Sequence, residues 1–132
     1  MKKTMLTVAV LHLAAGNAFA DSLVVITNSA GPAVTKEQVA DVYLGKSKSL
    51  KPLDLPNSAP AKAEFYQKVS GHDLSQVKAT WSRLMFTGQG QPPKEMPDAA
   101  AVKKAVAADP KAVGYIAKAD VDSSVKVAMT LP

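Results

Sequence analysis

The sequence contains no cysteine and only two histidines among its 132 residues. The absence of cysteine excludes disulfide bonds, thiolate metal ligands and a cysteine nucleophile. Two histidines leave little material for a metal site, and we expect no metal or other cofactor. Seven glycines and nine prolines are too few for a low-complexity linker protein. The length and the 47% apolar content are instead typical of one globular domain.

Motifs of the common enzyme classes are also absent. The chain has no G-x-S-x-G, H-E-x-x-H or P-loop sequence. We interpret His72, in the stretch S-G-H-D, as a solvated residue at a helix junction. Asp120 and Asp122 lack the oxygen-ligand spacing of a calcium loop and are interpreted as part of a solvated turn. We therefore expect no enzymatic activity.

The first twenty residues have the pattern of a secretory signal peptide. Lys2 and Lys3 form a basic start, residues 5–15 are mostly apolar, and Ala18-Phe19-Ala20 is an A-x-A cleavage sequence. The apolar run is short for a membrane span, although an uncleaved anchor is the alternative. No lipobox cysteine is present, which excludes a lipoprotein. We predict a signal peptide at 1–20, a domain at 21–132, a periplasmic location and no membrane-spanning segment after cleavage.

The predicted mature chain is only weakly basic. Removing twenty residues from 132 leaves 112, with 14 basic and 11 acidic side chains, a net charge of +3. The lysines are scattered, and no basic cluster is interleaved with stacking aromatic residues. A nucleic-acid partner is therefore not expected.

Hydrophobic periodicity and end signals divide the domain into eight elements. A T-x-x-Q capping box at Thr35, a proline in the first turn at Pro60 and stops at Gly45, Gly71 and Gly88 mark the helices most clearly. Strands are predicted at 22–26, 51–55, 112–116 and 125–129, and helices at 35–45, 60–71, 73–88 and 98–108, end residues included. The order β-α-β-α-α-α-β-β predicts an α/β layered domain with a mixed sheet.

Trp81 and Pro52 each predict a detail of the fold. Trp81 lies on the apolar stripe of the third helix with Leu74, Val77 and Leu84, which favours a core position over a ligand-stacking platform. Pro52 restricts its strand to an edge, or itself to the first position of the strand.

The start of the second helix is the candidate anion site. Helix N-termini present free N–H groups and a partial positive charge. Here Asn57 and Ser58 precede the helix and Lys62 lies in its first turn. Arg83, the only arginine of the mature chain, is a candidate for bidentate anion recognition, with a plain surface position as the alternative.

Several blocks of the sequence resemble a known family. They are V-V-I-T-N-S (24–29), T-K-E-Q-V-A-D-V-Y-L-G-K (35–46), L-P-N-S-A-P-A-K-A-E-F-Y (55–66), W-S-R-L-M-F-T-G-Q-G-Q-P-P (81–93) and P-K-A-V-G-Y-I (110–116). Together they resemble the periplasmic phosphate-binding proteins of phosphate ABC transporters, in particular short single-domain members. The resemblance implies part of a type II periplasmic-binding-protein fold, which usually has two α/β lobes around a phosphate.

The resemblance also implies a site and partners. It places the family's phosphate-binding S-G-T turn at Ala59-Pro60-Ala61, where both hydroxyls are missing and the proline lacks an N–H. The residues that remain for phosphate or a similar oxyanion are Ser58, Asn57, Ala61 and Lys62, with Thr27, Asn28, Ser29 and Arg83 as further candidates. A permease of the inner membrane is the implied partner. The alternative is a sensory or protein-interaction module that kept the fold without high-affinity ligand binding and signals to a membrane protein.

We predict that the exported protein begins at Asp21, because cleavage follows the A-F-A sequence. The intact mass of the protein in the periplasmic fraction tests this. A periplasmic species that retains residues 1–20 would contradict it.

Overall fold

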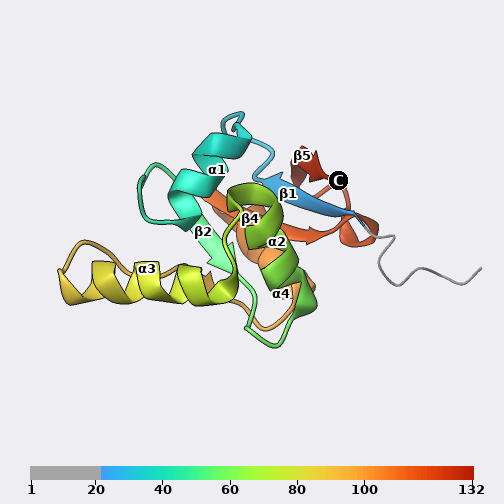
Figure 1. The fold of residues 1–132 in the computed structure, drawn as a ribbon. Coiled ribbons are helices and arrows are strands. Elements are labelled where there is room, and N and C mark those ends of the chain that lie inside the picture. Colours follow the sequence, from blue (N-terminus) through green and yellow to red (C-terminus); the bar gives the residue numbers. More distant parts are fainter. Residues whose placement is uncertain (1–21) are drawn as a thin grey trace, which may run out of the picture.

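The computed structural model describes residues 22–132, so the predicted signal peptide lies outside the described residues. These residues form one α/β domain with a mixed sheet, as the sequence predicts, and the sheet has five strands rather than the four expected (Figure 1). The strands are β1 (Leu23–Thr27), β2 (Lys51–Asp54), β3 (Lys94–Glu95), β4 (Ala112–Ala117) and β5 (Lys126–Leu131). The α-helices are α1 (Lys36–Tyr43), α2 (Pro60–Ser70), α3 (Leu74–Phe86) and α4 (Ala99–Ala108).

The strand order is β3-β2-β4-β1-β5. β1 runs antiparallel to both β4 and β5, whereas β2 runs parallel to β4 and to β3. All five residues of β1 are buried, which explains why its sequence is a continuous apolar run rather than an alternating one. The centre of the sheet is therefore formed by the two strands that the sequence marks most strongly, β1 and β4.

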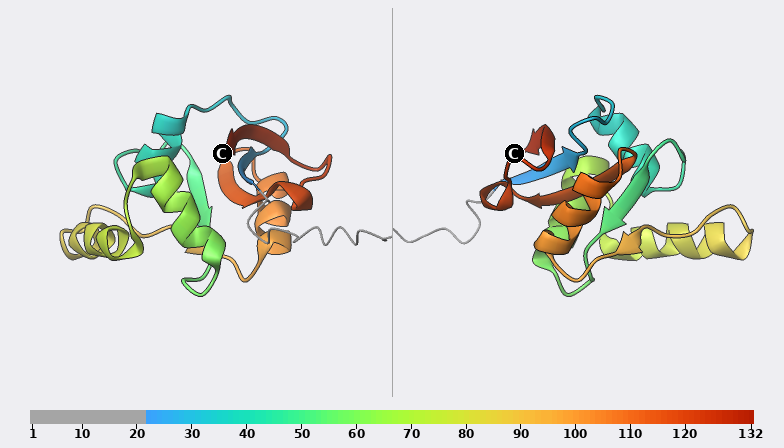
Figure 2. Two further views of the ribbon diagram at one scale, coloured as in Figure 1. Left: turned by 45° about the vertical axis from the view of Figure 1, so that its right-hand side comes forward. Right: turned by 180° about the vertical axis from the view of Figure 1, so that it is seen from behind.

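Helices cover both faces of the sheet, as the two opposite views show (Figures 1 and 2). Successive residues of β4 point to opposite faces of the sheet, and each face packs against different helices. A Cβ on Gly114 would lie 2.5 Å from Val102 Cγ1, so the missing side chain lets α4 approach one face closely. The next residue, Tyr115, stacks on Phe65 of α2 with ring centroids 4.0 Å apart. The core therefore lies in two layers, one on each face of the sheet.

Local end signals behave as the sequence predicts. Thr35 and Gln38 form the predicted capping box of α1. Asp73 and Gln76 form a second box on α3, and Gly71 ends α2 in the left-handed conformation at φ +70°. These contacts join residues that are close together in the chain, so they define the helix ends without help from tertiary packing.

Four details differ from the sequence prediction. Residues 94–95 form the short edge strand β3, which has no periodicity of its own because it is two residues long. A 3-10 turn follows β4 at residues 118–120, and β5 runs to Leu131 rather than ending at Met129. Pro52 is the second residue of β2, which is an inner strand. Because β3 pairs with β2 only from Leu53 onwards, the missing N–H of Pro52 leaves no hydrogen bond to β3 unmade.

Helix α3 projects from the body of the domain, and its inner part is anchored by Trp81 (Figures 1 and 2). Trp81 is 7% exposed, and its indole N–H donates to the Tyr43 carbonyl oxygen at 3.0 Å. Gly45, at φ +78°, allows this contact, because a Cβ there would lie 3.0 Å from the indole ring and 2.5 Å from Leu84 Cδ1. The core position of Trp81 is thus confirmed. Met85, which follows Leu84 on the same helix, is 45% exposed because the helix end extends past the body.

We predict that Trp81→Ala lowers the free energy of unfolding by about 3–5 kcal/mol, because it removes a buried aromatic side chain and leaves a cavity. Chemical denaturation measures the change. Phe86→Ala on the same helix is the matched control, since Phe86 is 94% exposed and its loss should cost less than about 0.5 kcal/mol. Free quenching of native Trp81 fluorescence by iodide would contradict the prediction.

Candidate functional site

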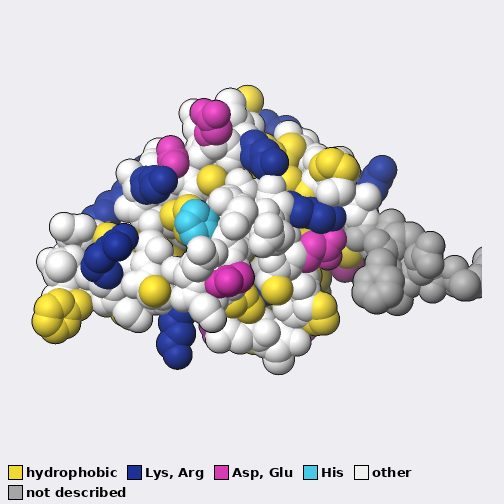
Figure 3. All heavy atoms as spheres, in the orientation of Figure 1, with side chains coloured by type: hydrophobic (Ala, Val, Ile, Leu, Met, Phe, Trp, Pro, Cys, Tyr) yellow, Lys and Arg dark blue, Asp and Glu magenta, His cyan; other side chains and the backbone are white. Residues whose placement is uncertain are grey.

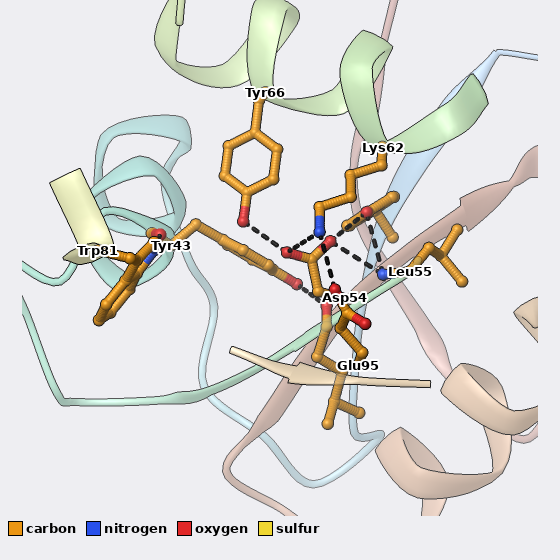
Figure 4. Close-up of polar contacts among 9 residues, drawn as sticks. Tyr43, Asp54, Leu55, Lys62, Tyr66, Trp81 and Glu95 are labelled. Carbon is orange, nitrogen blue, oxygen red and sulfur yellow. Dashed lines mark hydrogen bonds and ion pairs between the residues drawn. The ribbon is translucent and has the colours of Figure 1, made fainter. Parts of the chain in front are cut away.

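A buried carboxylate lies at the end of β2 (Figure 4). Asp54 is 3% exposed, and both its oxygens accept hydrogen bonds. Tyr66 of α2 donates its hydroxyl to Oδ2 at 2.6 Å, Tyr115 of β4 donates to Oδ1, and the Leu55 N–H donates to Oδ1 at 2.9 Å. A buried carboxylate is stable only when such donors replace the water it has lost.

Lys62 supplies the positive charge beside Asp54 (Figure 4). It lies in the first turn of α2, is 7% exposed, and places its Nζ 3.7 Å from Asp54 Oδ2. The same Nζ lies 3.2 Å from Glu95 Oε1, on the short strand β3. Two carboxylates therefore face one ammonium group. Their negative charges outnumber the positive charge of Lys62 by one.

The tyrosines around Asp54 are held in their protonated form. Burial raises the pKa of Tyr43, Tyr66 and Tyr115 well above the usual value, and the Asp54 carboxylate raises each of them further. Tyr43 does not reach Asp54, and donates its hydroxyl to the Leu53 carbonyl oxygen at 2.6 Å. The three rings thus tie α1, α2 and β4 to the end of β2.

An open hollow of about 460 Å³ lies beside this cluster, between the start of α2 and the side of α3. Two of the residues predicted from the sequence, Asn57 and Lys62, line it. The opposite wall comes from α3 and adds polar groups that the sequence analysis did not single out, namely Ser75, Lys78 and Ser82.

The first turn of α2 offers little hydrogen bonding of its own. Its N-cap residue, Ala59, makes no side-chain cap, and Pro60 has no N–H. The Lys62 N–H bonds back to the Ala59 carbonyl oxygen at 3.0 Å. Ala61 is therefore the residue of this turn whose N–H is left without a partner in the helix, and the exposed Ser58 lies three residues before it in the chain.

The predicted residues at the end of β1 do not join this hollow. Asn28 donates its side-chain amide to the Val106 and Ala107 carbonyl oxygens, each at 3.0 Å, and accepts from the Ala30 N–H. It therefore caps the C-terminus of α4, where the partial negative charge disfavours an anion. Thr27 is buried and its hydroxyl has no partner, whereas Ser29 is exposed.

Arg83 also lies apart from the start of α2. It is exposed on α3 and lines a separate hollow with Lys46 and His72. His72 is half-buried, with its Nδ1 3.0 Å from the Ser70 carbonyl oxygen, at the helix junction predicted from the sequence. No group of three or more acidic or histidine residues in the described range 22–132 could hold a metal ion.

Sequence reasoning missed Asp54, Glu95 and the tyrosines as a cluster. The available signal was that Tyr43 and Tyr115 lie among apolar residues and that Tyr66 follows Phe65 on the buried stripe of its helix, because a buried hydroxyl needs a polar partner. The partner itself could not be identified, since Asp54 and Tyr115 are 61 residues apart in the chain.

The fold is similar to that of solved phosphate-transport proteins. A proposed phosphate ABC transporter substrate-binding protein from Clostridium perfringens, solved with bound phosphate, matches with a TM-score of 0.64 and 19% identity over 81% of this chain and 44% of its own. An ABC-type phosphate transport receptor from Vibrio cholerae matches with a TM-score of 0.62 and 20% identity over 81% of this chain and 45% of its own. No family model and no curated protein sequence matches.

These comparisons show the fold alone. The domain corresponds to part of a periplasmic-binding-protein fold, and it spans less than half the length of either solved protein. None of the helices in residues 22–132 is both long and apolar enough to cross a membrane.

We predict that the three tyrosines make the domain sensitive to alkali. The folded state keeps their hydroxyls protonated, whereas the unfolded chain releases these protons near pH 10. Their contribution to stability is therefore fully present below about pH 10 and is lost above it, at about 1.4 kcal/mol per pH unit for each tyrosine.

Denaturant unfolding across this pH range, with tyrosinate absorbance followed in parallel, measures the effect. All three tyrosines should ionise together with unfolding. Tyr66→Phe is the control and should reduce the slope by about one third, because one of three groups is removed. A tyrosine that titrates near pH 10 in the folded protein would contradict the prediction.

Proposed function

We propose that this chain is a non-enzymatic solute-binding protein for phosphate or a similar small oxyanion, bound in the hollow at the start of α2. The observation that carries the proposal is the fold it shares with two phosphate-transport proteins, one of which was solved with bound phosphate. The hollow supports it, because it combines a helix N-terminus with the polar side chains of Asn57, Ser75 and Ser82.

The donors for an oxyanion would come from both walls of the hollow. The side chain of Asn57 would supply a neutral hydrogen bond from the α2 side, and those of Ser75 and Ser82 would do so from α3. Ser58 and Ala61 lie next to Asn57 and Lys62 in the chain but do not line the hollow. Lys78 supplies a positive charge from α3. Lys62 reaches the same space, but it is already paired with Asp54 and Glu95.

This arrangement favours weak binding. Glu95 repels an anion near Lys62, and the site is open on one side. We expect a dissociation constant of about 10 μM to 1 mM, or about 4 to 7 kcal/mol. Tighter binding would require a second protomer or another protein to close over the open side of the site.

Transport would require export and a membrane partner. The predicted signal peptide supports a periplasmic location, and a permease of the inner membrane is the partner we propose. Both remain proposals for this chain.

A sensory or interaction module is the second candidate function. The pairing of Lys62 with two carboxylates favours it, because the one buried cation at the site is not free for a ligand. A protein of this kind would keep the fold and bind a membrane protein instead of a solute.

Calorimetry with inorganic phosphate and sulfate distinguishes the two functions. We predict millimolar or tighter binding by the wild type, and binding that is weaker in Asn57→Ala, which removes a polar side chain that lines the hollow. Glu95→Gln should bind roughly threefold to tenfold more tightly, because it removes a partly exposed like charge next to the site.

Glu64→Gln is the matched control. It also removes a carboxylate paired with a lysine on α2, but outside the hollow, so its affinity should equal that of the wild type. No detectable binding at millimolar phosphate by the wild type or Glu95→Gln would contradict solute binding and favour the interaction module.

A further inference from the structure

The outer end of α3 exposes hydrophobic side chains that no part of the body covers. Phe86 is 94% exposed and Met85 is 45% exposed, and of the large hydrophobic side chains in residues 22–132 only Val127, on β5, is comparably open. Trp81 fixes the inner part of the same helix to the body. Phe86 and Met85, here called the tip of α3, are therefore presented on an anchored helix rather than on a loop.

The same segment is basic, with Asp73 directly before it and Glu95 directly after it. Residues 74–94, here called the α3 arm, contain Lys78, Arg83 and Lys94 and no acidic residue. The rest of residues 21–132 has 11 basic and 11 acidic side chains, so the excess of three positive charges lies in the arm. Figure 3 shows a hydrophobic side chain at the outer end of α3 and no acidic side chain on its outer part.

Further cations lie beside the arm. The loop at residues 44–50 contributes Lys46 and Lys48 and has no acidic residue. Lys46 and Arg83 line one hollow, and Lys48 lines another with residues 89–91 of the arm. None of these lysines, nor Arg83, takes part in the ion pairs found within residues 22–132.

We propose that the α3 arm contacts an anionic lipid surface. Phe86 and Met85 would enter the interfacial region, and the surrounding cations would lie against negatively charged headgroups. Aromatic side chains favour this region, and each Lys or Arg near an anionic surface adds to the attraction. The proposal does not depend on oxyanion binding at the start of α2.

The size of the tip favours a lipid surface over a protein partner. A buried aromatic side chain contributes about 150–250 Å², whereas a specific protein interface needs about 800 Å² on each side. The cations are also spread over α3, β3 and the loop at residues 44–50 instead of forming a ring around Phe86. A lipid surface accepts a narrow apolar tip with dispersed charge, and requires no matching shape.

Vesicle binding tests the proposal on the mature protein. We expect sedimentation with vesicles of equal parts phosphatidylglycerol and phosphatidylcholine, weakened by added salt, and little binding to phosphatidylcholine alone. Both lipids carry a phosphate, so the comparison separates surface charge from recognition of a phosphate group. At matched ionic strength, inorganic phosphate and chloride should weaken binding equally.

Two variants with matched controls locate the contact. Phe86→Ser should reduce the lipid partition coefficient at least severalfold, whereas Val127→Thr, at the other exposed hydrophobic position, should not. Replacing Lys78, Arg83 and Lys94 by glutamine should reduce it by roughly 100-fold, about fivefold for each charge. The same change at the exposed lysines 104, 111 and 118 lowers the net charge equally and should have a much smaller effect.

A spectroscopic variant tests insertion directly. In Phe86→Trp, brominated lipids should quench the new tryptophan while the buried Trp81 of the wild type stays unquenched. The proposal is overturned if the wild type binds neither vesicle, if both triple variants lose binding equally, or if the new tryptophan is not quenched. Self-association that is abolished by Phe86→Ser, without vesicle binding, would also overturn it and assign the tip to a second copy.

Discussion

The structure depends on the burial of one carboxylate, that of Asp54. Removing an ionised carboxylate from water costs several kcal/mol unless donors and a counter-charge replace the solvent. Here the replacements come from α2, β4, the chain next to Asp54 and the ammonium group of Lys62. Because these groups are far apart in the chain, satisfying Asp54 requires that β2, β4 and α2 take their final places together.

This requirement also limits the candidate binding site. Lys62 lies at the start of α2, where an oxyanion would benefit most from a positive charge, yet it already faces Asp54 and Glu95. The Lys62 side chain thus stabilises the folded state through Asp54 and also lines the proposed ligand site. Binding there must rely on neutral donors and on Lys78 across the hollow, a weaker combination than a free buried cation.

A second constraint positions α3. The indole of Trp81 and the space left by Gly45 fix the inner part of this helix, while its outer end extends past the body. The helix is therefore buried along its middle, at Val77 and Trp81, and its outer end keeps apolar and basic side chains in solvent. The wall of the hollow and the projecting tip are two parts of the same rigid element.

The sequence by itself determined the four α-helices and four of the five strands, because capping boxes, a first-turn proline, glycine stops and continuous apolar strands act over a few residues. Only the tertiary structure decided which polar groups meet. It joined Asn57 and Lys62 in one hollow, assigned Asn28 to the end of α4, separated Arg83, and brought Glu95 to Lys62 through the two-residue strand β3. The physical reason is the separation of the interacting residues along the chain. Caps and apolar stripes involve residues a few positions apart, whereas the partner of a buried charge comes from a distant segment that no local pattern identifies.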